Sequence, residues 1–126
     1  MSKNNQNNPA VIVSHLGTVS TVGDYPICNL PARFVLVSVK LLDQAGIAAD
    51  NTDYVTLTLK NGSSSLASYD SRAANQGAAI ALVAKSFALT AAEQVIAAGS
   101  DLKLSYAEGG TGTLTLAKVQ LSGYWA

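Results

Sequence analysis

The chain has 126 residues, of which 48% are hydrophobic, and its 8 basic side chains balance its 8 acidic ones. This length suits a single domain with its own core. A net charge of zero without a basic cluster argues against nucleic-acid binding and membrane binding, because both need a positive patch. Alanine supplies 20 of the apolar residues, so the composition favours close packing between weakly charged surfaces.

No apolar run approaches the roughly 20 residues that span a bilayer, and the polar N-terminus has no signal-peptide core. We therefore expect synthesis and retention in the cytoplasm. Cys28 is the only cysteine, which excludes an intrachain disulfide and a thiolate metal cluster. We interpret it as a small buried apolar residue rather than a reactive thiol.

Residues 1–9 form a polar segment that ends at Pro9, and residues 10–126 form the single expected domain. The segment is rich in Asn and Gln and too polar to bury surface alone, so we interpret it as an extended docking arm.

The clearest strand covers residues 54–60, where Val55, Leu57 and Leu59 alternate with polar neighbours and Asn61-Gly62 follows as a turn. A second strand covers 33–43, with odd and even positions on opposite faces and a first half that is buried on both sides. Weaker strands are expected at 10–16, 19–22 and 66–71.

Near the C-terminus, alternation over 101–106 is followed by the turn residues Glu108-Gly109-Gly110 and a second run over 111–116, which predicts a hairpin. The apolar positions then move from even numbers, ending at Leu116, to odd numbers, beginning at Val119. One extra residue near Ala117-Lys118 would reconcile the two phases, so we predict a β-bulge there.

The Ala-rich stretch 73–98 fits helix and buried strand alike. We interpret 79–89 as a strand. Thr90-Ala91-Ala92-Glu93 matches a capping box and Gly99 ends the run, so at most one short helical turn is expected within 90–98.

Seven or eight short strands joined by Gly, Asn, Asp and Ser turns indicate an all-β fold, an antiparallel β-sandwich or barrel. A jelly roll with an extended N-terminal arm is the preferred topology.

The sequence offers no set of catalytic, cofactor-binding or metal-binding residues, so we do not expect an enzyme. His15 is the only histidine and is interpreted as a half-exposed strand residue. Asp43, Asp50 and Asp53 could supply oxygen ligands to Ca²⁺, but they fit no recognised calcium loop and are favoured in turns for their own sake. Gly109–Gly112 lacks the helix and lysine of a phosphate loop and is interpreted as a turn.

Tyr124 and Trp125 are adjacent aromatic residues near the C-terminus. They could stack on a sugar, but we favour core packing or a subunit contact for them.

Three segments, 50–62, 97–104 and 110–116, share short Thr- and Leu-rich strands bounded by Gly, Asn and Asp turns. With the polar arm, they resemble the head decoration (cement) proteins of tailed bacteriophages. The resemblance covers the C-terminal three quarters of the chain.

The resemblance implies a structural virion protein on the capsid exterior, made in the host cytoplasm, that stabilises the capsid by bridging neighbouring major-capsid subunits. It implies a trimer. On this interpretation the capsid-binding residues belong to the arm and the start of the domain, and Tyr124 and Trp125 form a subunit contact. The capsid-binding set is Asn4, Asn5, Gln6, Asn7, Asn8, Pro9 and Ile12.

Two alternatives remain open: a tail- or fibre-associated virion β-sandwich, and a module that binds a glycan or cell surface. An exposed aromatic patch with polar neighbours would favour the second.

Overall fold

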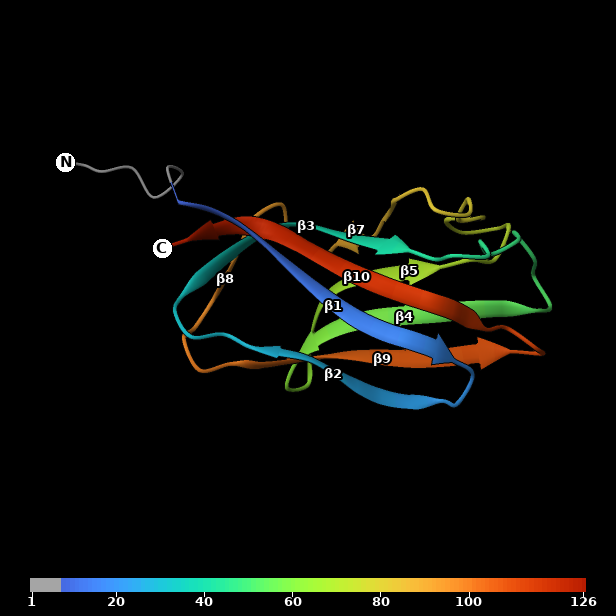
Figure 1. Cartoon of the computed structure of the whole chain (residues 1–126), viewed down its shortest axis with the longest axis horizontal. Coiled ribbons are helices and arrows are strands. Elements are labelled where there is room, and N and C mark those ends of the chain that lie inside the picture. The colour runs from blue at the N-terminus through green and yellow to red at the C-terminus, as the bar shows by residue number, and fades with distance from the viewer. Residues whose placement is uncertain (1–7) are drawn as a thin grey trace.

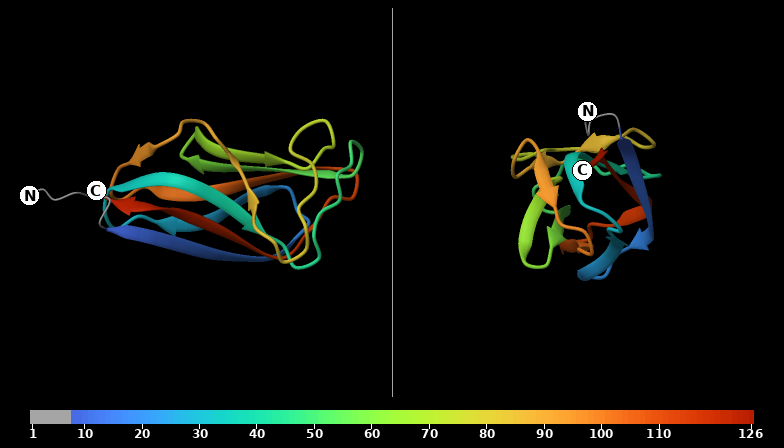
Figure 2. Two further views of the ribbon diagram at one scale, coloured as in Figure 1. Left: turned by 90° about the horizontal axis from the view of Figure 1, so that it is seen from above. Right: turned by 90° about the vertical axis from the view of Figure 1, so that its left-hand side faces the viewer.

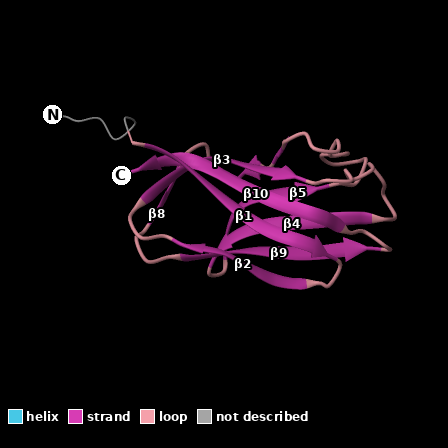
Figure 3. Ribbon diagram, in the orientation of Figure 1, coloured by secondary structure: helices cyan, strands magenta, loops and turns pink. Residues whose placement is uncertain are grey.

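The computed structural model describes residues 8–126, and every regular element in them is a β-strand (Figure 3). They contain no helix long and apolar enough to cross a membrane. Residues 4–7 of the predicted arm lie outside the described residues. The ten strands are β1 (Pro9–Val19), β2 (Gly23–Asn29), β3 (Phe34–Leu42), β4 (Tyr54–Asn61), β5 (Ser64–Asp70), β6 (Lys85–Ser86), β7 (Ala88–Leu89), β8 (Gln94–Ile96), β9 (Asp101–Gly109) and β10 (Leu114–Trp125).

The strands form two antiparallel sheets that pack face to face, so the expected antiparallel β-sandwich is confirmed. The sheet named A here has the order β1-β10-β3-β6, with β8 also pairing with β3. The sheet named B has the order β2-β9-β4-β5-β7. The start of β1 and the C-terminus lie at one end of the sandwich, and long loops gather at the other (Figures 1 and 2).

The core lies between the inward faces of the two sheets. Val55, Leu57 and Leu59 of β4 are fully buried, which confirms the alternation over 54–60. They face a second set of buried side chains from sheet A, which includes Leu41, Val119 and Leu121. Burying a side chain of this size contributes about 1.5 to 3 kcal/mol relative to exposure, so this layer is the main source of stability.

The predicted strand over 79–89 is wrong for its first half. Residues 80–84 form a turn, and only β6 and β7 at the end of the segment are extended. The two also separate: β6 pairs with the end of β3 in sheet A, and β7 pairs with β5 in sheet B. Ala-rich sequence fits a buried strand and a covered turn equally well, and the pattern cannot separate them.

No helical turn is present within 90–98, where bends lead directly into β8. The side chains of Thr90, the predicted cap, and of the nearby Gln94 bond to β5. The Thr90 hydroxyl donates to the Ser65 carbonyl at 3.0 Å, and the Gln94 amide donates to the Leu66 carbonyl at 2.7 Å. Tertiary hydrogen bonds therefore outcompete the local cap.

The hairpin predicted between 101–106 and 111–116 is also wrong, because β9 belongs to sheet B and β10 to sheet A. The turn carries the chain across the sandwich. The Asp53 carboxylate accepts from the Thr111 N–H at 3.0 Å and holds this crossing in place.

β2 replaces the strand expected at 19–22, which is instead the end of β1 and a turn. The residue pattern did not predict β2, because Pro26 lies inside it and proline argues against a strand. Proline is tolerated in an edge strand, where one N–H faces outward, and β2 is an edge of sheet B.

The β-bulge predicted near residue 117 is confirmed. Leu114 and Ala117 both point inward, whereas Leu116 between them is exposed and has a positive φ of 45°. The register between β1 and β10 shifts at the same place. The extra residue lets both halves of β10 present apolar side chains to the core.

A second irregularity lies between Ser122 and Gly123, where the pairing of β10 with β3 shifts by one residue and leaves Val37 without a partner. The predicted alternation of β3 therefore reverses at Val37: Phe34 and Leu36 precede it on the core side, and Val39 and Leu41 follow. A Cβ at Gly123 would collide with the Val35 carbonyl oxygen, so glycine is required at this close approach.

We predict that Gly123→Ala lowers the free energy of unfolding by about 1 to 3 kcal/mol, because the new methyl group overpacks the β3–β10 contact. Urea unfolding measures the change. Gln120→Ala, on the outer face of the same strand, is the matched control and should change stability by about 0.5 kcal/mol or less. Equal changes in the free energy of unfolding for the two substitutions would contradict the requirement for glycine at position 123.

Candidate functional site

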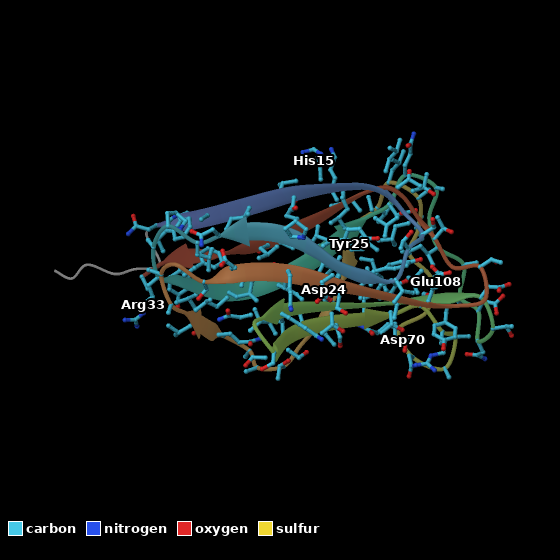
Figure 4. All side chains as sticks on the ribbon, turned by 90° about the horizontal axis from the view of Figure 1, so that it is seen from below. His15, Asp24, Tyr25, Arg33, Asp70 and Glu108 are labelled. Atoms are coloured by element: carbon cyan, nitrogen blue, oxygen red, sulfur yellow. The ribbon has the colours of Figure 1, made fainter. Side chains whose placement is uncertain are left out.

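The residues considered for catalysis do not converge. His15 projects from β1 into solvent, and Asp70 lies on the opposite side of the molecule (Figure 4). Across the strands, the partner of His15 is Lys118. Among residues 8–126, no three His, Cys, Asp or Glu side chains come together as metal ligands would.

The three aspartates of the predicted loop each bind backbone N–H groups. Asp50 Oδ1 accepts from Thr52 and Asp53 at 2.7 and 3.1 Å, which lowers the pKa of its carboxyl. Asp43 is 1% exposed, and its Oδ1 accepts from the Thr115 N–H at 2.7 Å. Asp50 and Asp53 border a cavity of about 400 Å³. Local turn formation accounts for Asp50, whereas the Asp43 and Asp53 carboxylates bind the distant backbone N–H groups of Thr115 and Thr111.

Asp43 is the buried carboxylate that ties the loop end together. Its backbone carbonyl accepts from Leu82 N–H at 2.9 Å, and the neighbouring Gln44 N–H donates to Thr115. Its Oδ2 is buried without a hydrogen bond of standard geometry. Burial raises the pKa of the carboxyl, and nearby backbone N–H groups, that of Thr115 first, offset only part of this rise.

Cys28 is half-buried in β2, and burial raises the pKa of its thiol. A raised pKa leaves little thiolate at neutral pH, which agrees with a structural rather than a reactive cysteine.

Tyr124 and Trp125 point to opposite faces of sheet A. The Trp125 ring packs edge-on against Phe34, with 5.0 Å between the ring centroids, and contacts the core. Tyr124 is directly opposite Pro9 on one side and Val35 on the other, so it faces outward.

The described part of the predicted capsid-binding set begins at Asn8. Asn8 and Pro9 are exposed, whereas Ile12 packs against the core. The apolar side chains that β1 exposes are the neighbours of Ile12: Val11 is 61% exposed and Val13 is 45% exposed. The sequence carries a signal for them, since an uninterrupted apolar run over 10–13 places apolar groups on both faces of a strand.

The outer face of sheet A carries an apolar row at the end of the sandwich where β1 begins. Cross-strand pairing places Pro9, Tyr124, Val35 and Val95 in register across four strands. Directly paired residues of antiparallel strands share a face, so these four side chains lie in one row, in which Val95 is 60% exposed and Val35 only 5% exposed. We name the outward side chains of sheet A the A face.

The outer face of sheet B is polar. The corresponding row across its five strands is Asp24, Ser105, Thr58, Ser68 and Ala88. Every large apolar side chain that a described strand exposes belongs to sheet A: Val11, Val13, Val37, Val95 and Leu116. The outer face of sheet A therefore carries exposed apolar side chains among polar ones such as Ser122 and Gln120, whereas the strands of sheet B expose no large apolar side chain.

The A face also ends in an open edge. β1 pairs with β10 on one side, and its other side has no strand partner among residues 8–126. An edge strand of eleven residues presents unpaired N–H and C=O groups to which another chain can add a strand.

At the loop end, Leu82 and Leu116 are the two described non-glycine residues with positive φ, 62° and 45°. Both are more than half exposed, and together with Leu42 they line a cavity of about 120 Å³. A positive φ costs leucine roughly 1 to 2 kcal/mol, and strained residues cluster at functional sites. The loop end thus extends the apolar character of the A face.

We predict opposite pH dependences for two uncharged variants. The pKa of Asp43 is raised in the folded protein, so its contribution to stability is greatest below its ordinary pKa of 3.8 and is lost as pH rises through the folded-state value. The free energy of unfolding of Asp43→Asn, relative to that of the wild type, should therefore increase from pH 3 to pH 7. Urea unfolding at both pH values measures the difference.

Asp50→Asn is the control with the opposite sign. The lowered pKa of Asp50 contributes stability above pH 3.8 that is lost on acidification. The free energy of unfolding of this variant, relative to that of the wild type, should therefore decrease as pH rises. Parallel profiles for the two variants would contradict the assignment of Asp43 as a carboxyl disfavoured in its charged form.

Comparison with known proteins identifies no relative: no family model, curated protein or solved structure matches the chain. Function is therefore inferred from the residues of the chain itself.

Proposed function

We propose that the protein is a structural virion component that binds the outer surface of an assembled phage capsid through the A face and bridges neighbouring major-capsid subunits. One observation carries the proposal: the large apolar side chains that the strands expose all lie in sheet A. Large apolar side chains that are exposed together on one sheet are more typical of a protein-binding site than of a surface that only faces water.

The strand order supports the same proposal. We propose that the domain is an eight-stranded jelly roll. The assignment uses the orders β1-β10-β3-β6 and β2-β9-β4-β5, with β8 beside β3 in the same position as β6. Jelly rolls occur in viral capsid proteins and in lectins. Tyr124 lies in an apolar row and Trp125 packs on Phe34, which favours a protein partner over a sugar.

Bridging follows from where the arm joins the domain. β1 begins at Pro9, at the end of the sandwich that carries the apolar row (Figure 1). A segment of eight residues spans up to about 28 Å when extended, enough to reach a neighbouring subunit while the A face rests on the first. Two linked contacts raise the overall affinity even when each is modest.

We predict that Val11→Ser combined with Val13→Ser weakens binding to empty mature capsids of the encoding virus on the order of 100-fold. The loss reflects about 3 kcal/mol for two valine side chains that are no longer buried on docking. Cosedimentation with the capsids measures affinity and copy number. Ala88→Ser combined with Ala107→Ser, exposed on sheet B, is the matched control and should bind like the wild type.

Deletion of residues 1–8 in the same assay should lower occupancy as well, because the second contact is removed. Unchanged occupancy after the deletion would contradict a contact between the arm and the capsid. Equal capsid binding by the two double variants would contradict the A face as the docking surface.

The proposal includes a trimer in which Tyr124 lies at the subunit contact, so that the docking surface of each subunit is the remainder of the A face around Val11 and Val13. Light scattering at micromolar concentration should give three times the 12.9 kDa mass of one chain, and Tyr124→Ser should lower that mass. A monomeric mass for the wild type would contradict the trimer without affecting the docking face.

A further inference from the structure

The neutral total charge conceals a separation of charge between the two sheets. The strands of sheet A contain no Asp or Glu, whereas those of sheet B contain four acidic residues. The acidic residues of sheet B are Asp24, Asp70, Asp101 and Glu108. The A face therefore carries positive charge only.

Lys40 and Lys118 are neighbours on the A face. Lys118 lies opposite Leu42 and Lys40 lies opposite Gln120, which makes the two lysines diagonal partners on adjacent strands. His15 is directly opposite Lys118 on the other side. Diagonal and direct partners in a sheet lie within reach of long side chains, so these three residues form one basic cluster.

The two lysines of the cluster form no ion pair among the described residues, whereas Lys103 of sheet B does. Lys103 pairs with Asp24 at 3.1 Å, and its hydrogen bond and charge, with a smaller effect from Lys60, lower the pKa of that carboxyl. Arg72 pairs with Asp70 at 2.5 Å. Lys85, in sheet A, donates to the Gln76 carbonyl at 2.8 Å. The two lysines are thus left without an ion-pair partner among the described residues, although the buried Asp43 lines the same cavity as Lys118.

The cluster also has apolar groups on both sides. Val11 and Val13 precede His15 along β1 toward the arm, and Leu42 and Leu116, with Leu82, line the cavity beside Lys118 at the loop end. A partner that buries both apolar parts must place its own groups against the lysines. Unpaired positive charge at such a position is costly unless the partner supplies negative charge.

We propose that the partner of the A face is a protein surface on which carboxylates lie between apolar side chains, with the carboxylates facing Lys40, Lys118 and His15. The inference rests on the proposed function for the location of the partner and adds its chemistry. A nucleic-acid partner is disfavoured because the cluster is small and bounded by valine and leucine rather than continued along the sheet.

The first test does not depend on the capsid. Poly-L-glutamate is titrated into ¹⁵N-labelled protein in 50 mM NaCl, and amide chemical shifts locate the contact. We expect the changes to centre on Lys40, Lys118 and His15 and to disappear at 500 mM NaCl. Changes centred on sheet B, or tighter binding of a duplex DNA than of poly-L-glutamate, would overturn the proposal.

The second test uses matched charge reversals. Lys40→Glu with Lys118→Glu should weaken poly-L-glutamate binding and capsid binding at least about 10-fold in 50 mM NaCl and flatten the salt dependence. Lys60→Glu with Lys103→Glu makes the same net charge change on sheet B and should leave both nearly unchanged. Thermal melting confirms that the variants fold.

The outcomes separate the two proposals. Capsid binding that is equal for the two double variants would overturn the acidic partner and leave the docking function intact. Absence of capsid binding by the wild type would overturn the docking function, while the poly-L-glutamate titration would still decide the charge preference of the A face.

Discussion

The pairing of β10 between β1 and β3 is the contact on which the rest of the structure depends. β10 joins the first strand of the domain to its third, and without it sheet A has no centre. Two irregularities make the pairing possible. The bulge at Leu116 sets the phase of the inward side chains, and Gly123 allows β3 to approach where Val37 is extruded. Since these contacts join residues far apart in sequence, they form only when the whole sandwich closes.

The same pairing creates the A face. It aligns Pro9, Tyr124 and Val35 into one apolar row and brings Lys118 beside His15 and Lys40. None of these neighbours is close in sequence. The strands of sheet B, by contrast, contain more acidic than basic side chains, pair Lys103 with Asp24, and expose threonine, serine and alanine. The difference between two outer faces, rather than any single residue, is the feature that supports a docking function.

The sequence predicted the elements whose side chains are decided by local alternation. The strand at 54–60 and the bulge near residue 117 follow from the spacing of Val55, Leu57, Leu116 and Val119 alone. It failed where tertiary contacts overrode the local signal. Thr90 and Gln94 bond to β5 instead of capping a helix. Pro26 hides an edge strand, and the Ala-rich stretch is divided between two sheets because alanine fits either environment.

For the candidate site, the sequence by itself determined the all-β class and the polar composition of residues 1–9, of which Asn8 and Pro9 are exposed in the structure. It pointed to Ile12, whereas the register of β1 against β10 turns Ile12 toward the core and Val11 and Val13 outward. Only the tertiary structure decided that this neutral chain places only basic charge on the strands of sheet A and an excess of acidic side chains on the strands of sheet B. Alternation along a strand fixes which residues share a face, but which strands share a sheet is settled by long-range pairing, and charge segregation depends on that pairing.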